Sequence, residues 1–106
     1  MACWLNGVCG GRYKKKTYLC NNLLEIGLLK CNVGESIGIH TDPITNKKQY
    51  KIQINICKPN IGGIFTCERY TLNIPFIKIY RADLSKHGVS LVSKGKRVDL
   101  IIGINL

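Results

Sequence analysis

Alternation of apolar and polar residues is the clearest pattern in this chain. Between positions 48 and 57, Tyr50, Ile52, Ile54 and Ile56 alternate with polar or small residues. A period of two places these four side chains on one face of a β-strand. The pattern therefore predicts a half-buried strand over residues 48–57, with the isoleucines toward the core.

A turn and a second strand are expected directly after it. Residues 58–63 contain one proline and two glycines, and residues 64–72 are rich in aromatic and β-branched side chains. These compositions are typical of a turn and a strand, so the two segments predict a hairpin. Cys57 and Cys67 would flank that hairpin and could face each other across it, although an intracellular chain normally keeps such thiols reduced.

Further strands are expected over 35–41, 76–81, 89–93 and 97–105. The first should pair with the strand at 48–57 through a turn at 42–46, and Lys94-Gly95 fits a tight turn between the last two. Short helices are expected at 21–29, capped by Asn21 or Asn22, and at 82–87, ended by Gly88. The chain is therefore predicted to be mostly β, as one domain over residues 1–106. The expected architecture is a small β-barrel or sandwich of seven to eight strands with one or two short helices.

Two segments, 24–39 and 84–100, share a spacing of glycines followed by apolar residues at alternate positions. The stretch from Gly34 to Ile39 resembles the helix-turn-strand element of swapped-hairpin (AbrB-like) and double-psi β-barrels, and the resemblance covers about a third of the chain. It implies an interlocked, dimeric barrel that acts as a DNA-binding regulator or antitoxin. The basic reading residues of AbrB-like proteins lie near a Gly-Arg pair, which Gly11-Arg12 would match. The chain departs from these families by placing six residues between its two glycines.

Length and charge narrow the class. The chain has 106 residues and a net charge of +10, from 16 Lys and Arg against 6 Asp and Glu. This length suits one small domain, and no apolar run approaches the ~20 residues that span a bilayer. The first residues lack the features of a secretory signal, so a cytoplasmic protein without a membrane partner is expected. Abundant Ile, Lys and Asn suggest AT-rich coding, as in a low-GC bacterium or one of its viruses or mobile elements.

The positive charge gathers in clusters that alternate with tyrosines, which suits a phosphate backbone with stacked bases. The predicted partner is a polyanion (DNA, RNA or a nucleotide) or an acidic host protein, and a homo-oligomer is expected. The candidate nucleic-acid- or anion-binding residues are Arg12, Tyr13, Lys14, Lys15, Lys16, Lys47, Lys48, Lys51, Lys94, Lys96 and Arg97.

Catalytic and metal-binding signals are weak in the sequence. The six carboxylates are well separated, the six cysteines form no Cys-x-x-Cys pair, and the two histidines stand apart. His40 and Asp42 share a strand face, and Cys20 or Cys31 could complete a nucleophile-base set with them. No metal, no cofactor and no enzymatic activity are therefore predicted. The favoured function is a nucleic-acid-binding regulator; the alternative is a virus- or mobile-element-encoded inhibitor that binds a host protein or captures an anionic nucleotide.

Overall fold

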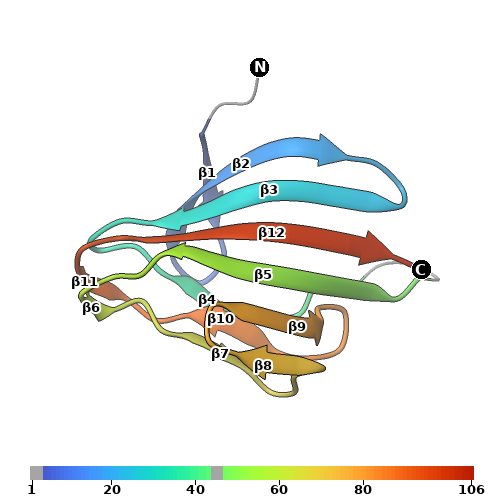
Figure 1. Ribbon diagram of the computed structural model, residues 1–106. Coiled ribbons are helices and arrows are strands. Elements are labelled where there is room, and N and C mark those ends of the chain that lie inside the picture. Colours follow the sequence, from blue (N-terminus) through green and yellow to red (C-terminus); the bar gives the residue numbers. More distant parts are fainter. Residues whose placement is uncertain (1–3, 44–46) are drawn as a thin grey trace.

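A computed structural model describes residues 4–43 and 47–106, and in these residues every regular element is a β-strand (Figure 1). The strands are β1 (Leu5–Val8), β2 (Arg12–Cys20), β3 (Leu24–Cys31), β4 (Ile37–His40), β5 (Gln49–Cys57), β6 (Ile61–Gly62), β7 (Phe65–Cys67), β8 (Leu72–Ile74), β9 (Ile77–Arg81), β10 (His87–Val89), β11 (Val92–Lys94) and β12 (Arg97–Asn105).

The strands form two layers. Seven of them make one antiparallel sheet in the order β1-β2-β3-β12-β5-β9-β8, while β4-β10-β7 and β11-β6 make smaller sheets. Tyr13 and Gln53 of the large sheet line the same cavity as Ile37 and Val89 of the three-stranded sheet, so this small sheet covers the inner face of the large one. The mostly β prediction is confirmed. The closed barrel is wrong, because β1 and β8 are free edges of an open sheet.

The inner face of the large sheet is mixed: Cys31, Tyr80 and Ile101 are buried there beside polar residues, and on β5 the buried residues are polar. On β5 the buried residues are Gln49 and Gln53, at 5% and 2% exposure, whereas Ile56 is 60% exposed. The predicted strand at 48–57 is confirmed as β5, but the face expected in the core is the outer one. The period of two is the same for either orientation, so alternation alone does not show which face the smaller sheet covers.

Asp99 is the centre of the buried polar network. Its carboxylate is 2% exposed and accepts hydrogen bonds from Gln53 Nε2 at 2.8 Å, Asn55 Nδ2 at 2.8 Å and Arg97 Nε at 2.7 Å. Gln53 Oε1 in turn accepts a bond from the Tyr80 hydroxyl at 2.8 Å. The network joins β12, β5 and β9, and each charge in it has an internal partner.

Both expected helices are wrong. The Asn21 side chain accepts bonds from the amides of Leu23 and Leu24 at 2.9 Å, which is the chemistry of a cap, but here it stabilises the turn between β2 and β3. In the second segment, one bond from Ser85 N to Arg81 O makes a single turn, and the chain then enters β10 at His87. The described residues form twelve strands, where seven or eight were expected.

Several strands exist as predicted but pair differently. The segment after β5 splits into β6 and β7, which pair with β11 and β10. The hairpin with β5 is therefore wrong, and β5 lies between β12 and β9. The strand expected at 35–41 is β4, but it pairs with β10. The turn at Gly95 has the positive φ it was expected to need, 85°, yet β11 and β12 diverge into different sheets.

The likeness between 24–39 and 84–100 extends only to their last part, where Gly34 and Gly95, both with positive φ, precede the strands β4 and β12. The earlier parts differ, because the first segment contains the long strand β3 and the second contains a turn and the short strands β10 and β11. The resemblance to AbrB-like or double-psi barrels stays a prediction. Within the described residues, the search for a helix long and apolar enough to cross a membrane finds none.

Removing the Asp99 carboxylate should destabilise the fold strongly. Asp99→Ala leaves Arg97 buried without its anion and strips partners from Gln53 and Asn55, so we expect a loss of ~3–5 kcal/mol in the free energy of unfolding. Tyr80→Phe removes one hydrogen bond and should cost ~1 kcal/mol. Chemical denaturation of the purified variants measures both, and equal losses in the two would contradict the central role of Asp99.

Candidate metal centre

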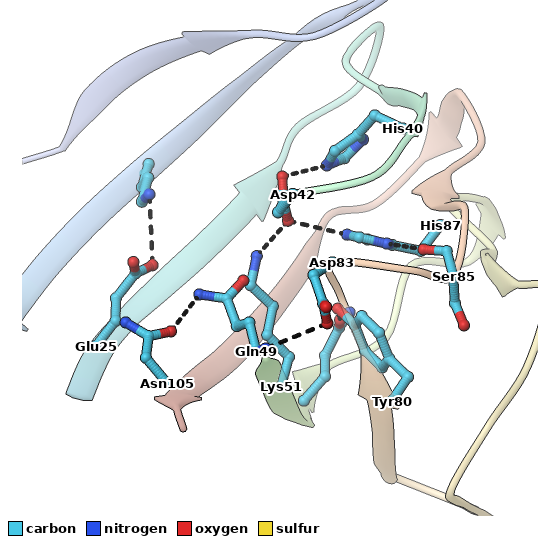
Figure 2. Close-up of polar contacts among 12 residues, drawn as sticks. Glu25, His40, Asp42, Gln49, Lys51, Tyr80, Asp83, Ser85, His87 and Asn105 are labelled. Carbon is cyan, nitrogen blue, oxygen red and sulfur yellow. Dashed lines mark hydrogen bonds and ion pairs between the residues drawn. The ribbon is translucent and has the colours of Figure 1, made fainter. Parts of the chain in front are cut away.

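Two histidines and one aspartate converge beneath the three-stranded sheet. His40 ends β4, Asp42 follows it in the loop, and His87 begins β10. Asp42 Oδ1 lies 3.3 Å from His40 Nε2, and Asp42 Oδ2 lies 3.2 Å from His87 Nε2 (Figure 2). One ligand atom from each residue falls within 4.8 Å of the others, so the three could share one metal ion.

Backbone carbonyls orient both imidazole rings. His40 Nδ1 lies 2.7 Å from Gly38 O, and His87 Nδ1 lies 2.8 Å from Ser85 O. A carbonyl oxygen only accepts, so each Nδ1 carries the proton, and each Nε2 of a neutral ring presents a lone pair. Both lone pairs then face carboxylate oxygens, which is repulsive unless a cation lies between them. That cation is either a proton on each ring or one metal ion.

Neighbouring side chains hold this arrangement in place. Lys51 Nζ lies 2.6 Å from Asp42 Oδ2. The His87 ring is 4% exposed and packs against the rings of His40 and Tyr80, with centroids 4.5 and 4.9 Å away. A side chain at Gly88 would meet the backbone oxygen of Ile37 at 2.7 Å, so only glycine lets β10 approach β4 closely enough to set His87 there.

The charges favour an ionised aspartate. Burial alone would raise the pKa of Asp42, but hydrogen bonds from His40 and His87 and the nearby Lys51 outweigh burial and hold this pKa well below its usual range. The hydrogen bond to Asp42 raises the pKa of His40 above its ordinary value, against a smaller opposing effect of burial. Burial also raises the pKa of Tyr80 well above 10, so its hydroxyl stays neutral.

The cluster lines a cavity of ≈ 100 Å³ between the two layers, together with Tyr13, Lys15 and Glu25. Lys15, Glu25, Asp42 and Lys51 also line a wider depression of ≈ 420 Å³, which leads outward past Gln49. Lys15 Nζ lies 3.5 Å from Glu25 Oε1 at this mouth. Among the described residues, Gln49 Oε1 is a buried acceptor without a hydrogen-bond donor.

The predicted anion-binding residues are dispersed by the fold. Tyr13, Lys15 and Lys51 line the cavity, because alternate residues of β2 and β5 face inward. Arg97 is held inside by Asp99. Lys16 lies over the rings of Trp4 and Tyr18 at 5.3 and 5.8 Å, away from the cavity. The others also lie outside it: Arg12, Lys47, Lys48, Lys94 and Lys96 are exposed, and Lys14 is half-buried.

His87 is the residue that the sequence interpretation missed. His40 and Asp42 were linked by their spacing, but His87 is 45 residues from Asp42 and reaches it only through the pairing of β10 with β4. Neither Cys20 nor Cys31 lines the cavity, so the nucleophile-base set does not form. Burial raises the pKa of Cys31 to about 11, which keeps that thiol protonated at neutral pH.

Comparison with known proteins gives a fold but no family. No protein-family model matches the chain, and no curated protein matches it in sequence. A solved structure from Thermotoga maritima, described as a predicted oxalate decarboxylase, is similar with a TM-score of 0.68 and 16% sequence identity. The match covers 99% of this chain and 92% of that one. At this identity the likeness concerns the fold.

The prediction of a protein without enzymatic activity is wrong. It depended on the scatter of carboxylates and histidines along the sequence, whereas the fold gathers His40, Asp42 and His87 in one cavity. The same fold also occurs in a protein described as a predicted decarboxylase.

The cluster predicts an unusual pH dependence for the chelator-treated protein. A lowered Asp42 pKa stabilises the fold above about pH 4, and this contribution is lost as pH falls. A raised His40 pKa stabilises the fold fully below about pH 6.5 and is lost as pH rises through the folded-state pKa. The melting temperature should therefore peak between these values and fall toward pH 8.

Thermal unfolding monitored by circular dichroism across pH 3–9 tests this expectation. His40→Gln should flatten the alkaline side of the profile, because glutamine does not titrate. A wild-type melting temperature that is constant or rises from pH 6.5 to 8 would contradict the assignment.

Proposed function

We propose that this protein is a cupin-like enzyme that holds one divalent first-row transition metal on His40, Asp42 and His87 and acts on a small carboxylate. The observation that carries the proposal is the orientation of the two rings. Both Nδ1–H groups are bonded to backbone carbonyls, and both Nε2 atoms converge on one carboxylate. Two histidines and one carboxylate are a known ligand set for such metals, with open positions left for substrate.

The residues present fit a metal ion. Ligating histidines characteristically donate their second ring N–H to a carbonyl or carboxylate, which fixes the tautomer, and both rings here do so. Asp42 has two oxygens, so one can serve as a ligand while Lys51 stays on the other. When bound, a divalent ion would supply Lewis-acid polarisation of a substrate oxygen.

The protein's own groups would bind the substrate and manage its protons. Lys15 and Lys51 lie between the mouth and the cluster, and each is paired with a carboxylate, Glu25 and Asp42 respectively. An anionic substrate would bind there as an alternative partner for either ammonium group. Loss of CO2 from a carboxylate breaks a C–C bond and requires a proton on the remaining carbon. Lys51 carries exchangeable protons inside the cavity, with its side chain 15% exposed. The cavity of ≈ 100 Å³ limits the substrate to a few non-hydrogen atoms, a size that oxalate satisfies.

Metal binding is the first test. Chelator-treated protein should bind Mn²⁺, Co²⁺ or Zn²⁺ with one ion per chain in calorimetric titration, and binding should raise the melting temperature. Asp42→Asn and His87→Gln should each weaken binding by about 100-fold or more, since each removes a ligand.

Asp83→Asn is the matched control for Asp42→Asn. Asp83 also forms a short ion pair, at 2.6 Å to Arg81 Nη2, but lies outside the cluster. Its variant should bind metal like the wild type. Failure of the wild-type protein to bind any of the three ions, or equal losses in both variants, would refute the metal centre.

Substrate binding is tested separately at the mouth. With the metal-bound protein, CO2 release from oxalate and other small mono- and dicarboxylates can be followed directly. Lys15→Met should raise KM for an active substrate by about tenfold with little change in kcat, since it removes a binding charge remote from the ligands. Lys14→Met, on the neighbouring residue outside the cavity, should leave KM unchanged; equal effects of the two changes would argue against an anion path through the mouth.

Polyanion binding is a second candidate, favoured by the net charge of +10. Lys47, Lys48, Lys94 and Lys96 are exposed and leave this charge available at the surface. The nucleic-acid-binding and inhibitor functions, the cytoplasmic location and the identity of any host partner stay predictions.

A further inference from the structure

The face of the large sheet that points away from the three-stranded sheet is a continuous apolar surface, here called the outer face. Strand register places its side chains in rows that run across β3, β12, β5, β9 and β8. One row is Leu28, Leu100, Ile54, Ile77 and Ile74, and the next is Ile26, Ile102, Ile52, Ile79 and Leu72. Both central rows consist of isoleucine and leucine throughout.

No described element covers this surface. Residues of these rows on β3, β12, β5 and β9 are half-buried by their neighbours in the sheet, and Leu72 and Ile74 on β8 are exposed. In Figure 1, β3, β12 and β5 lie in the foreground with no other ribbon crossing in front of them. The three-stranded sheet lies on the opposite face of the large sheet, where it lines the cavity. The ten aliphatic side chains of these two rows therefore lack a second layer among the described residues.

Charge is confined to the borders of the outer face. Lys16 adjoins Leu28 at the β2 edge, and Arg81 lies beyond Ile79 and is neutralised by Asp83. Lys30, in the row beyond Leu28, has its ammonium 4.3 Å from the centroid of the Trp4 ring. A partner of opposite charge would need free cations to recognise; the two central rows hold none, and in the flanking rows Lys30 lies over Trp4 and Arg81 is paired with Asp83. In a contact between two copies of this chain, both contacting surfaces are apolar and the like charges lie at the rim. A second copy therefore suits the outer face.

We infer that two copies of this chain pack their outer faces together as a sheet-on-sheet dimer. Five strands at ~4.8 Å spacing, with the two central rows and the rows flanking them, cover on the order of 600 Å² per copy. Two such faces bury about 1,200 Å², which reaches the lower limit of standard stable interfaces. The cavity mouths of both copies would then open away from the interface.

The solution mass tests this inference independently of any metal or substrate. Light scattering coupled to size exclusion at micromolar concentration should give twice the chain mass of 11.9 kDa. Ile102→Lys and Ile52→Lys place a charge at the centre of the outer face and should raise the dimer dissociation constant by at least about 100-fold. Ile102→Thr in combination with Ile52→Thr serves where a lysine variant does not fold, and should weaken the dimer in the same direction.

Leu84→Lys and Leu91→Lys are the matched controls, because these leucines are 64% and 55% exposed on other parts of the surface. Both should remain dimers. A wild-type monomer at 100 µM, or a dimer that the outer-face variants leave intact, would overturn the inference. A larger oligomer that only the control variants disrupt would assign the contact to another surface.

Discussion

Alternation along the strands of the large sheet is the constraint on which the other features depend. When one residue of a strand faces inward, its two neighbours in the sequence face outward. The orientation of one residue therefore determines which side chains of the strand lie on each face. The chain turns Gln53, Asp99 and Lys51 inward and the isoleucines of β5 and β9 outward, while Ile101 of β12 faces inward. That choice demands internal partners for buried polar groups, and the Asp99 network supplies them. The buried polar groups and the apolar outer face are thus two results of a single register.

Buried polar partners also explain how a small domain can hold the cluster of His40, Asp42 and His87. A carboxylate in an apolar core would tend to take up a proton, because burial disfavours its charge. Asp42 is instead surrounded by His40, His87 and Lys51, and hydrogen bonds from the two histidines together with the nearby Lys51 lower its pKa despite burial. Such a charged site is tolerated at the boundary between the two layers, where Gly38 of β4 and Ser85, just before β10, supply the backbone carbonyls that orient the rings.

Strands and turns that depend on local pattern were predicted from the sequence. Features that depend on pairing between distant segments were not. The strand at 48–57 and the last strand follow from alternation, and the turn at Gly95 follows from its need for positive φ. The inverted orientation of β5 does not, because period-two alternation fits both faces equally. The helix expected at 21–29 fails because Asn21 offers the same bonds to a strand turn as to a helix start. His40 and Asp42 were paired correctly by spacing, but His87 joins them only through the β4–β10 ladder.

The fold places the basic residues differently from what their clustering in the sequence suggested. A cluster such as Arg12 to Lys16 is one patch in sequence, but a strand divides it between two faces, so Lys15 lies at the cavity mouth and Lys16 beside Trp4. Positive charge therefore serves the interior as well as the surface. Lys51 neutralises Asp42, Arg97 neutralises Asp99, and Lys15 adjoins Glu25. With few carboxylates in the chain, three are engaged along this inner face, and the unpaired excess lies outside it. A field of that sign draws anions toward the molecule, whereas the lysines that line the cavity are paired with carboxylates and act on a ligand only at contact distance.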